Sequence, residues 1–189
     1  MSRWKSFHHA GTTYDLSHLN SFLHTFVQPA KGELPAKTYP VQVEFGLHCF
    51  TREAGKNDDL QGPLAVTHQG ETRIFDLRRY ERSRELAAII RQLPAQACFH
   101  TKKAANFLTI KSINAAGAAD SYEVYFSVRR MVAAGRLLLI VKSAYVRDGR
   151  HTNQPAKKKV DFFVILHKRL AGEVVADRSE IQSAMKKAP

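Results

Sequence analysis

Two short segments carry the side chains best suited to chemistry. His100–Lys103 supplies a histidine and two lysines, and a predicted strand ends with Ser143, Tyr145 and Arg147 on one face. Metal-independent cleavage of RNA needs such groups: a base removes the 2′-hydroxyl proton, an acid protonates the leaving oxygen, and cations stabilise the charged phosphorane. An imidazole exchanges protons near neutral pH. If the two segments meet at one rim of a sheet, the candidate catalytic residues are His100, Ser143, Tyr145 and Arg147.

Three basic clusters are candidates for binding phosphate around the same rim. They are the arginine face of a predicted helix, the lysine pair after His100, and a basic loop that ends at Lys159. Clustered cations attract phosphates, and neutralising the phosphates releases counterions. The nucleic-acid-binding candidates are Arg78, Arg79, Arg82, Lys102, Lys103, Arg150, Lys157, Lys158 and Lys159. Phosphate binding without catalysis and a merely solvated basic surface are the alternatives.

A second acid/base pair is available at Glu44 and His48, which point to the same side of an extended chain. An exposed polar face of a strand explains the same two residues, and we favour that explanation. Zinc-ligand types occur at His48, Cys49, Cys98 and His100. Adjacent strand residues point to opposite sides, however, and no CxxC or HxxxH spacing pre-organises a pair. We therefore expect no metal and no other cofactor.

The elements that must position these residues follow from hydrophobic periodicity. Apolar residues at helical spacing predict one long helix from the N-cap Asp76 to Leu93, stopped by Pro94. Short connections between successive strands favour antiparallel neighbours. We expect an α+β fold, an antiparallel sheet of about five strands with the long helix packed on one face. The predicted strands are 41–48, 107–113, 122–131, 137–147 and 160–167.

The domain organisation is expected to be simple. Prolines and glycines break the first segment, so residues 1–40 should form an extended N-terminal arm. Residues 41–175 should form a single α+β core domain, and residues 176–189 a C-terminal helix or tail.

Composition limits the classes of function. The chain has 189 residues, with 29 Lys and Arg against 17 Asp and Glu and a formal net charge of +12. A hydrophobic content of 44% excludes a disordered polybasic tail, so the excess charge belongs to a folded protein with an anionic partner. No apolar run reaches the roughly 18 residues of a membrane-spanning helix. With two cysteines and no signal peptide, we expect a cytoplasmic protein that does not use the membrane.

Several segments carry a resemblance to known families. Val43–Thr51, Asn106–Thr109, Tyr122–Phe126, Ser143–Asp148 and Phe162–Leu166 resemble a group of uncharacterised bacterial proteins, which brings no activity with it. More distantly, the order of a helix, a four-strand meander and a hydroxyl-and-aromatic signature over Asp76–Leu170 resembles the barnase, EndoU, colicin and RelE group of ribonuclease domains. This second resemblance implies a metal-independent ribonuclease of the toxin or defence type, with an acidic protein or antitoxin as partner.

The sequence thus favours a basic cytoplasmic protein that binds nucleic acid, RNA rather than DNA, and cleaves it without a metal. A non-catalytic RNA- or DNA-binding module that uses the same basic surface is the alternative. A third hypothesis is a basic protein that docks on the acidic face of another protein.

Overall fold

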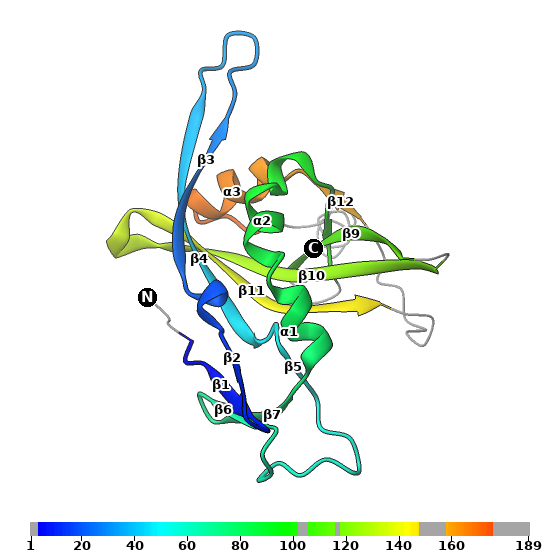
Figure 1. Ribbon diagram of the computed structural model, residues 1–189. Coiled ribbons are helices and arrows are strands. Elements are labelled where there is room, and N and C mark those ends of the chain that lie inside the picture. Colours follow the sequence, from blue (N-terminus) through cyan, green and yellow to red (C-terminus); the bar gives the residue numbers. More distant parts are fainter. Residues whose placement is uncertain (1–3, 102–105, 116–117, 148–157, 176–189) are drawn as a thin grey trace, which may run out of the picture.

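The computed structural model describes residues 4–101, 106–115, 118–147 and 158–175 (Figure 1). The three α-helices are α1 (Leu77–Ser83), α2 (Leu86–Arg91) and α3 (Phe162–Leu170), and the short 3₁₀ helices are η1 (Ser17–Leu19), η2 (Leu93–Ala95) and η3 (Val132–Ala134). The strands are β1 (Phe7–His9), β2 (Thr12–Tyr14), β3 (Phe22–Gln28), β4 (Lys37–His48), β5 (Thr51–Arg52), β6 (Ala65–His68), β7 (Glu71–Phe75), β8 (Cys98–His100), β9 (Asn106–Ala115), β10 (Ala118–Met131), β11 (Arg136–Arg147) and β12 (Lys159–Val160).

The main sheet is mixed and has seven strands, so the expectation of an antiparallel sheet of about five strands is wrong. Its order is β12-β8-β9-β10-β11-β4-β3, with two smaller sheets, β5-β7-β6 and β1-β2, beside it. The meander β9-β10-β11 is antiparallel, as predicted. Strand β4, however, pairs with β11 in parallel. Residues 49–135 separate these two strands, and such a long crossover permits a parallel pair that short-connection reasoning does not consider.

The predicted long helix is also wrong, because the chain forms two short helices in its place. The N–H of Glu85 donates to the carbonyl of Arg82 at 3.1 Å. This hydrogen bond spans three residues, as in a 3₁₀ helix, and it interrupts the α-helical hydrogen bonding between α1 and α2. The break lets Tyr80 of α1 and Leu86 of α2 both reach the core. Asp76 is the N-cap of α1, as expected.

The last predicted strand, 160–167, is a helix. Asp161 accepts hydrogen bonds from the backbone N–H groups of Phe163 and Val164 and thereby caps α3. Phe162, Ile165 and Leu166, at helical spacing, are buried. Only the two residues of β12 before the helix extend the sheet.

The N-terminal segment is not an extended arm. It forms β1, β2, η1 and β3, and β3 pairs with β4 to make the outer hairpin of the main sheet. Leu16, Leu19 and Phe26 are buried in the hydrophobic core. The expected C-terminal helix or tail, 176–189, lies outside the described residues.

A β-bulge in β11 decides which side chains face the core near the end of this strand. Tyr125 of β10 is opposite Ser143 and Phe126 is opposite Val141, so one residue of β11 is extra. Val141 and Ala144, which lie on opposite sides of the bulge, are both buried in the core. Tyr145 is therefore directed to the other face of the sheet.

No helix in the described parts of the chain combines the length and the apolar character that crossing a membrane requires.

Candidate functional site

Helix α1 carries three arginines to one pocket at the end of the main sheet. The carboxylate of Asp76 accepts the N–H of Arg79 at 2.9 Å, and the N–H of Asp76 donates to the carbonyl of Phe50 at 3.1 Å. The start of α1 is thereby tied to the turn after β4. The pocket has a volume of about 120 Å³, and its walls are Asp76, Arg78, Arg79, Arg82, Tyr122, Tyr145 and Val146.

This volume suits a ligand group of several heavy atoms. One water molecule needs only about 10–15 Å³ of cavity. Guanidinium groups match phosphate and carboxylate oxygens through pairs of parallel hydrogen bonds. The walls therefore favour an anionic group of about the size of a phosphate.

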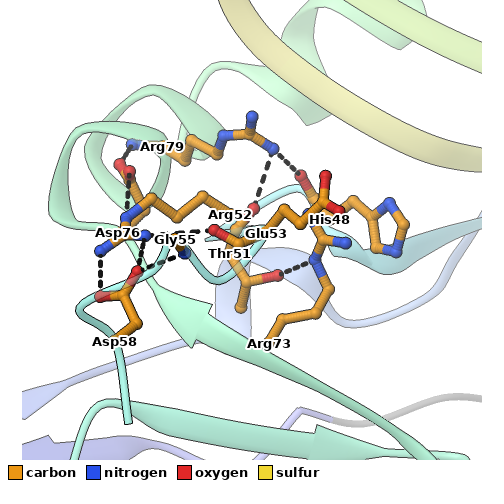
Figure 2. A network of polar contacts seen from close by, with 9 residues as sticks. All are labelled: His48, Thr51, Arg52, Glu53, Gly55, Asp58, Arg73, Asp76 and Arg79. Atoms are coloured by element: carbon orange, nitrogen blue, oxygen red, sulfur yellow. Dashed lines mark hydrogen bonds and ion pairs between the residues drawn. The ribbon is translucent and has the colours of Figure 1, made fainter. Parts of the chain in front are cut away.

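Arg79 is held by two backbone carbonyls and an aromatic ring. Its Nη1 donates to the carbonyl of Thr51 at 2.8 Å and to that of His48 at 3.2 Å (Figure 2). Its guanidinium lies 5.3 Å from the ring centroid of Tyr145, within the range of a cation–π contact. Burial lowers the pKa of Arg79, but an arginine stays charged at neutral pH. This cation is thus fixed in place before any ligand arrives.

The one carboxylate of the pocket wall is already compensated by a neighbouring cation. Asp76 lies 3.8 Å from Nε of Arg52. Arg52 also donates through Nη2 to Asp58 at 2.7 Å, and the N–H of Gly55 donates to the same carboxylate at 2.7 Å (Figure 2). The hydrogen bonds from Arg52 and then Gly55 lower the pKa of Asp58 to about 2. Asp76 is thus paired with Arg52, and among the pocket arginines Arg82 is paired with Glu85 at 2.9 Å.

Tyr122 contributes a hydroxyl group with no partner. Its side chain is 1% exposed, and its hydroxyl has no hydrogen bond in the described structure. Burial raises the pKa of Tyr122, so the phenol is neutral and retains a proton to donate. A buried hydroxyl without a partner is unfavourable unless a ligand supplies an acceptor.

A second polar cluster lies on the sheet face opposite the core and holds Tyr145. Glu123 is 0% exposed. Its carboxylate accepts one hydrogen bond from Nε of Arg147 at 2.7 Å and another from the hydroxyl of Tyr125 at 2.7 Å. The hydroxyl of Tyr145 donates to that of Tyr125 at 3.2 Å, and the two rings stack. The hydrogen bond to Glu123 raises the pKa of Arg147. The cluster fixes the ring of Tyr145 beside the pocket.

The structure does not bring His100 to the other predicted catalytic residues. His100 lies on β8, three strand spacings from Tyr145 on β11, which is about 14 Å along the sheet. Its N–H donates to the carbonyl of Lys158 at 2.8 Å, and its ring packs on Phe107. Ser143 lies on β11, where its neighbours across the strands are Tyr125 and His48.

The predicted basic residues are divided between two places. Arg78, Arg79 and Arg82 line the pocket. Lys158, just before β12, and Lys159, the first residue of β12, are both exposed beside β8. The remaining members of the predicted set, Lys102, Lys103, Arg150 and Lys157, lie outside the described residues.

The suggested pair of Glu44 and His48 has other partners. Glu44 accepts the side-chain amide of Gln42 at 2.7 Å, whereas Nε2 of His48 lies 2.7 Å from Oε1 of Glu71. Cys49 and Cys98 are free and buried, and burial raises the pKa of each thiol to about 12. Across the described ranges, no group of three or more His, Cys, Asp and Glu side chains is placed to hold a metal ion.

Sequence reasoning missed Tyr122, Glu123 and Tyr125 as parts of the site. Alternation assigns Tyr122 to the apolar face of its strand, and the ring indeed belongs to the core. The available signal was the hydroxyl on that apolar face, because a buried phenol ordinarily requires a partner.

Comparison with models of protein families gives a match over most of the chain. The model of the YjaZ family matches residues 6–170. This match agrees with the expected membership of a bacterial protein family, and it does not confirm the resemblance to ribonuclease domains. No curated protein and no solved structure matches the chain.

Proposed function

We propose that this chain, which belongs to the YjaZ family, binds RNA through the pocket of helix α1. The observation that carries the proposal is that three arginines and Tyr122, whose buried hydroxyl has no hydrogen-bond partner, line one pocket of about 120 Å³. Guanidinium groups and a neutral phenol are all donors, so the pocket favours the oxygens of a backbone phosphate. The net charge of +12 supports a polyanionic ligand over a small anion.

We propose RNA over DNA because the metal-independent cleavage that the residue types suggest requires a 2′-hydroxyl, and we place the protein in the cytoplasm. The two free, buried cysteines are compatible with a reducing compartment. The acidic face of another protein, such as an antitoxin, would compete with RNA for the same arginines, so such a partner should displace bound RNA.

Binding of labelled single strands tests the proposal. We compare the wild type with the double variant Arg78→Gln/Arg82→Gln, using fluorescence anisotropy with RNA and with DNA of the same sequence. A hydrogen bond to a charged group contributes about 1.5–3 kcal/mol, so the double variant should bind RNA at least about tenfold more weakly.

The matched control is Arg129→Gln/Arg130→Gln, because both arginines are exposed at the far end of β10 and do not line the pocket. It should bind RNA within about twofold of the wild type, in the range of ordinary surface substitutions. Equal losses in the two double variants, or no RNA binding by the wild type, would contradict the proposal.

A second candidate function is metal-independent cleavage of the bound RNA. Tyr145 favours it, because this residue lines the pocket and its hydroxyl is hydrogen bonded through Tyr125 to the carboxylate of Glu123. Tyrosine can transfer protons in catalysis. In this scheme Tyr145 takes the proton-transfer role that the sequence suggests for His100, and Arg79 stabilises phosphate charge.

Incubation of total RNA with the protein, in EDTA and in magnesium, separates binding from cleavage on a gel. Cleavage in EDTA that is lost in Tyr145→Phe but kept in His100→Ala supports the second candidate. If the RNA stays intact in both buffers and binding is weakened in Arg78→Gln/Arg82→Gln, the protein binds RNA without cleaving it.

A further inference from the structure

Strand β3 is an open edge of the main sheet. It is the last strand in the sheet order, and β4 is its only strand neighbour among the described residues. Its sequence, Phe22-Leu-His-Thr-Phe-Val-Gln28, contains no Lys, Arg, Asp, Glu, Pro or Gly. Natural edge strands usually carry charges, prolines or bulges that prevent pairing with another chain. β3 has none of these protections, which marks it as a site for strand addition.

Pro40 reveals which backbone groups of β3 point to the open edge. Thr25 lies directly opposite Pro40 in the antiparallel β3–β4 pair. Proline has no N–H, so this pair cannot exchange two hydrogen bonds and must be of the non-hydrogen-bonded kind. The N–H and C=O groups of Leu23, Thr25 and Val27 therefore point away from β4, toward the open edge.

The side chains of the same three residues are exposed. Leu23 is 53% exposed and Val27 is 57% exposed, with Thr25 exposed between them. Two copies of this pattern are self-complementary in an antiparallel arrangement centred on Thr25, which sets each leucine opposite a valine. Cross-strand apolar and Thr–Thr pairs stabilise a sheet.

We propose that β3 pairs with β3 of a second copy of this chain, so that two sheets join about a two-fold axis through Thr25. Thr25 faces its own equivalent, and Leu23 faces Val27 of the partner copy. These three pairs exchange about six backbone hydrogen bonds. The same patch serves both copies, as a two-fold interface requires.

The charges around β3 bear on whether a second copy can bind here. Two molecules with a net charge of +12 each repel one another, so contact is least opposed along a strand that has no Lys or Arg of its own. The nearby cation is Arg91 of α2, whose guanidinium lies 4.4 Å from the ring centroid of Phe22. His24 is the only titratable residue of β3, and burial, followed by the charge of Arg91, lowers its pKa, which favours the neutral form. The hairpin of β3 and β4 also projects beyond the rest of the described chain (Figure 1), which gives a partner access to the edge.

Molecular mass in solution tests the proposal. By sedimentation equilibrium, the wild type should show a concentration-dependent mass that rises toward twice 21.3 kDa. Thr25→Pro removes the central outward N–H without removing a bond to β4, since proline is tolerated where an edge N–H faces solvent. This variant should stay a monomer with an unchanged circular dichroism spectrum, whereas Thr25→Val, which keeps the N–H, should dimerise as the wild type does.

Cross-linking tests the register and does not depend on the proline variant folding. Paired residues of this kind have Cα atoms about 5.5 Å apart, within the range of a disulfide. Thr25→Cys should form a covalent dimer on mild oxidation, and Lys37→Cys, exposed on the inner strand β4, should not. The native thiols are buried and do not compete. A mass of 21.3 kDa at every concentration, or equal cross-linking at both positions, overturns the proposal. Because β3 does not line the pocket, RNA binding is decided separately.

Discussion

Tyr122 combines two features that rarely occur together, complete burial and an unpartnered hydroxyl. Neighbouring core residues such as Val124 and Phe126 are apolar, so the phenol adds a polar group where a phenylalanine would pack equally well. An unmade hydrogen bond costs about 1–3 kcal/mol in a buried site. Under the proposed function, a ligand acceptor in the pocket would recover that cost.

Tyr122→Phe should therefore stabilise the free protein by about 1 kcal/mol, because it removes only the unsatisfied hydroxyl. The same change should weaken RNA binding about twofold to tenfold through the loss of one neutral hydrogen bond. Urea unfolding and anisotropy measure the two effects. Tyr39→Phe is the matched control: its hydroxyl donates to Gln28 at 3.1 Å, so its loss should destabilise the protein. A loss of stability in Tyr122→Phe would show that the hydroxyl has a partner in the protein.

The ion pair of Glu123 and Arg147 is the most buried in the described structure, with side chains 1% and 14% exposed. Neutralising Glu123 removes the carboxylate that pairs with the guanidinium of Arg147 at 2.7 Å. Glu123→Gln should lower the free energy of unfolding by about 3–5 kcal/mol, measured in urea. In the control Glu71→Gln, the lost pairs with His48 and Arg73 are more exposed, and the effect should stay below about 1 kcal/mol. Similar effects for both variants would mean that solvent screens Glu123.

At the scale of elements, the sequence predicts strands well where alternation is long and poorly where an apolar run is short. The sequence of β10 alternates over Tyr122–Val128, and its place beside β9 and β11 follows from short connections. The run Phe162–Leu166 is apolar at five successive positions, which fits a buried strand as well as a buried helix. The helix is stabilised by the N-cap at Asp161 and by the packing of Phe162 on Phe26.

Helix α3 should depend measurably on its cap. Asp161→Ala removes the carboxylate that accepts the N–H of Phe163 at 2.8 Å, and it should cost about 1 kcal/mol of stability in thermal unfolding. Asp161→Asn keeps an acceptor at the same place and should cost much less. Equal effects of the two substitutions would indicate that packing alone forms α3.

The loop between β5 and β6 should be held by Asp58 in a pH-dependent way. Its pKa of about 2 is below the unfolded value of about 3.9, so its contribution is complete above about pH 4 and disappears as the pH falls through 2. The NMR shift of the Gly55 amide, whose N–H donates to Asp58, should follow this titration. Asp58→Asn should abolish the pH dependence. A midpoint near 3.9 in the wild type would show that the contact with Arg52 does not persist in solution.

At the scale of the whole molecule, part of the candidate site was predictable and part was not. The arginines of α1 and Tyr145 could be named from residue type and spacing, because a cationic helix face and a polar strand end are visible in the sequence. Their meeting depends on the crossover that brings the turn after β4 beside β11, a contact between residues far apart in the chain. The separation of His100 from Tyr145 has the same origin, because sheet order, not chain order, places β8 three strands away.

The dependence of RNA binding on salt should distinguish the pocket from the general positive charge. For single strands, each neutralised phosphate contributes about 0.7 to the slope of log K against log salt concentration. If Arg78 and Arg82 each neutralise one phosphate, the slope of the Arg78→Gln/Arg82→Gln variant should be less steep than that of the wild type by about 1.4, measured between about 50 and 200 mM salt. The Arg129→Gln/Arg130→Gln control has the same net charge as the pocket variant, but it should keep the wild-type slope. An unchanged slope in the pocket variant, despite weaker binding, would mean that its arginines act through the fold and do not contact phosphate.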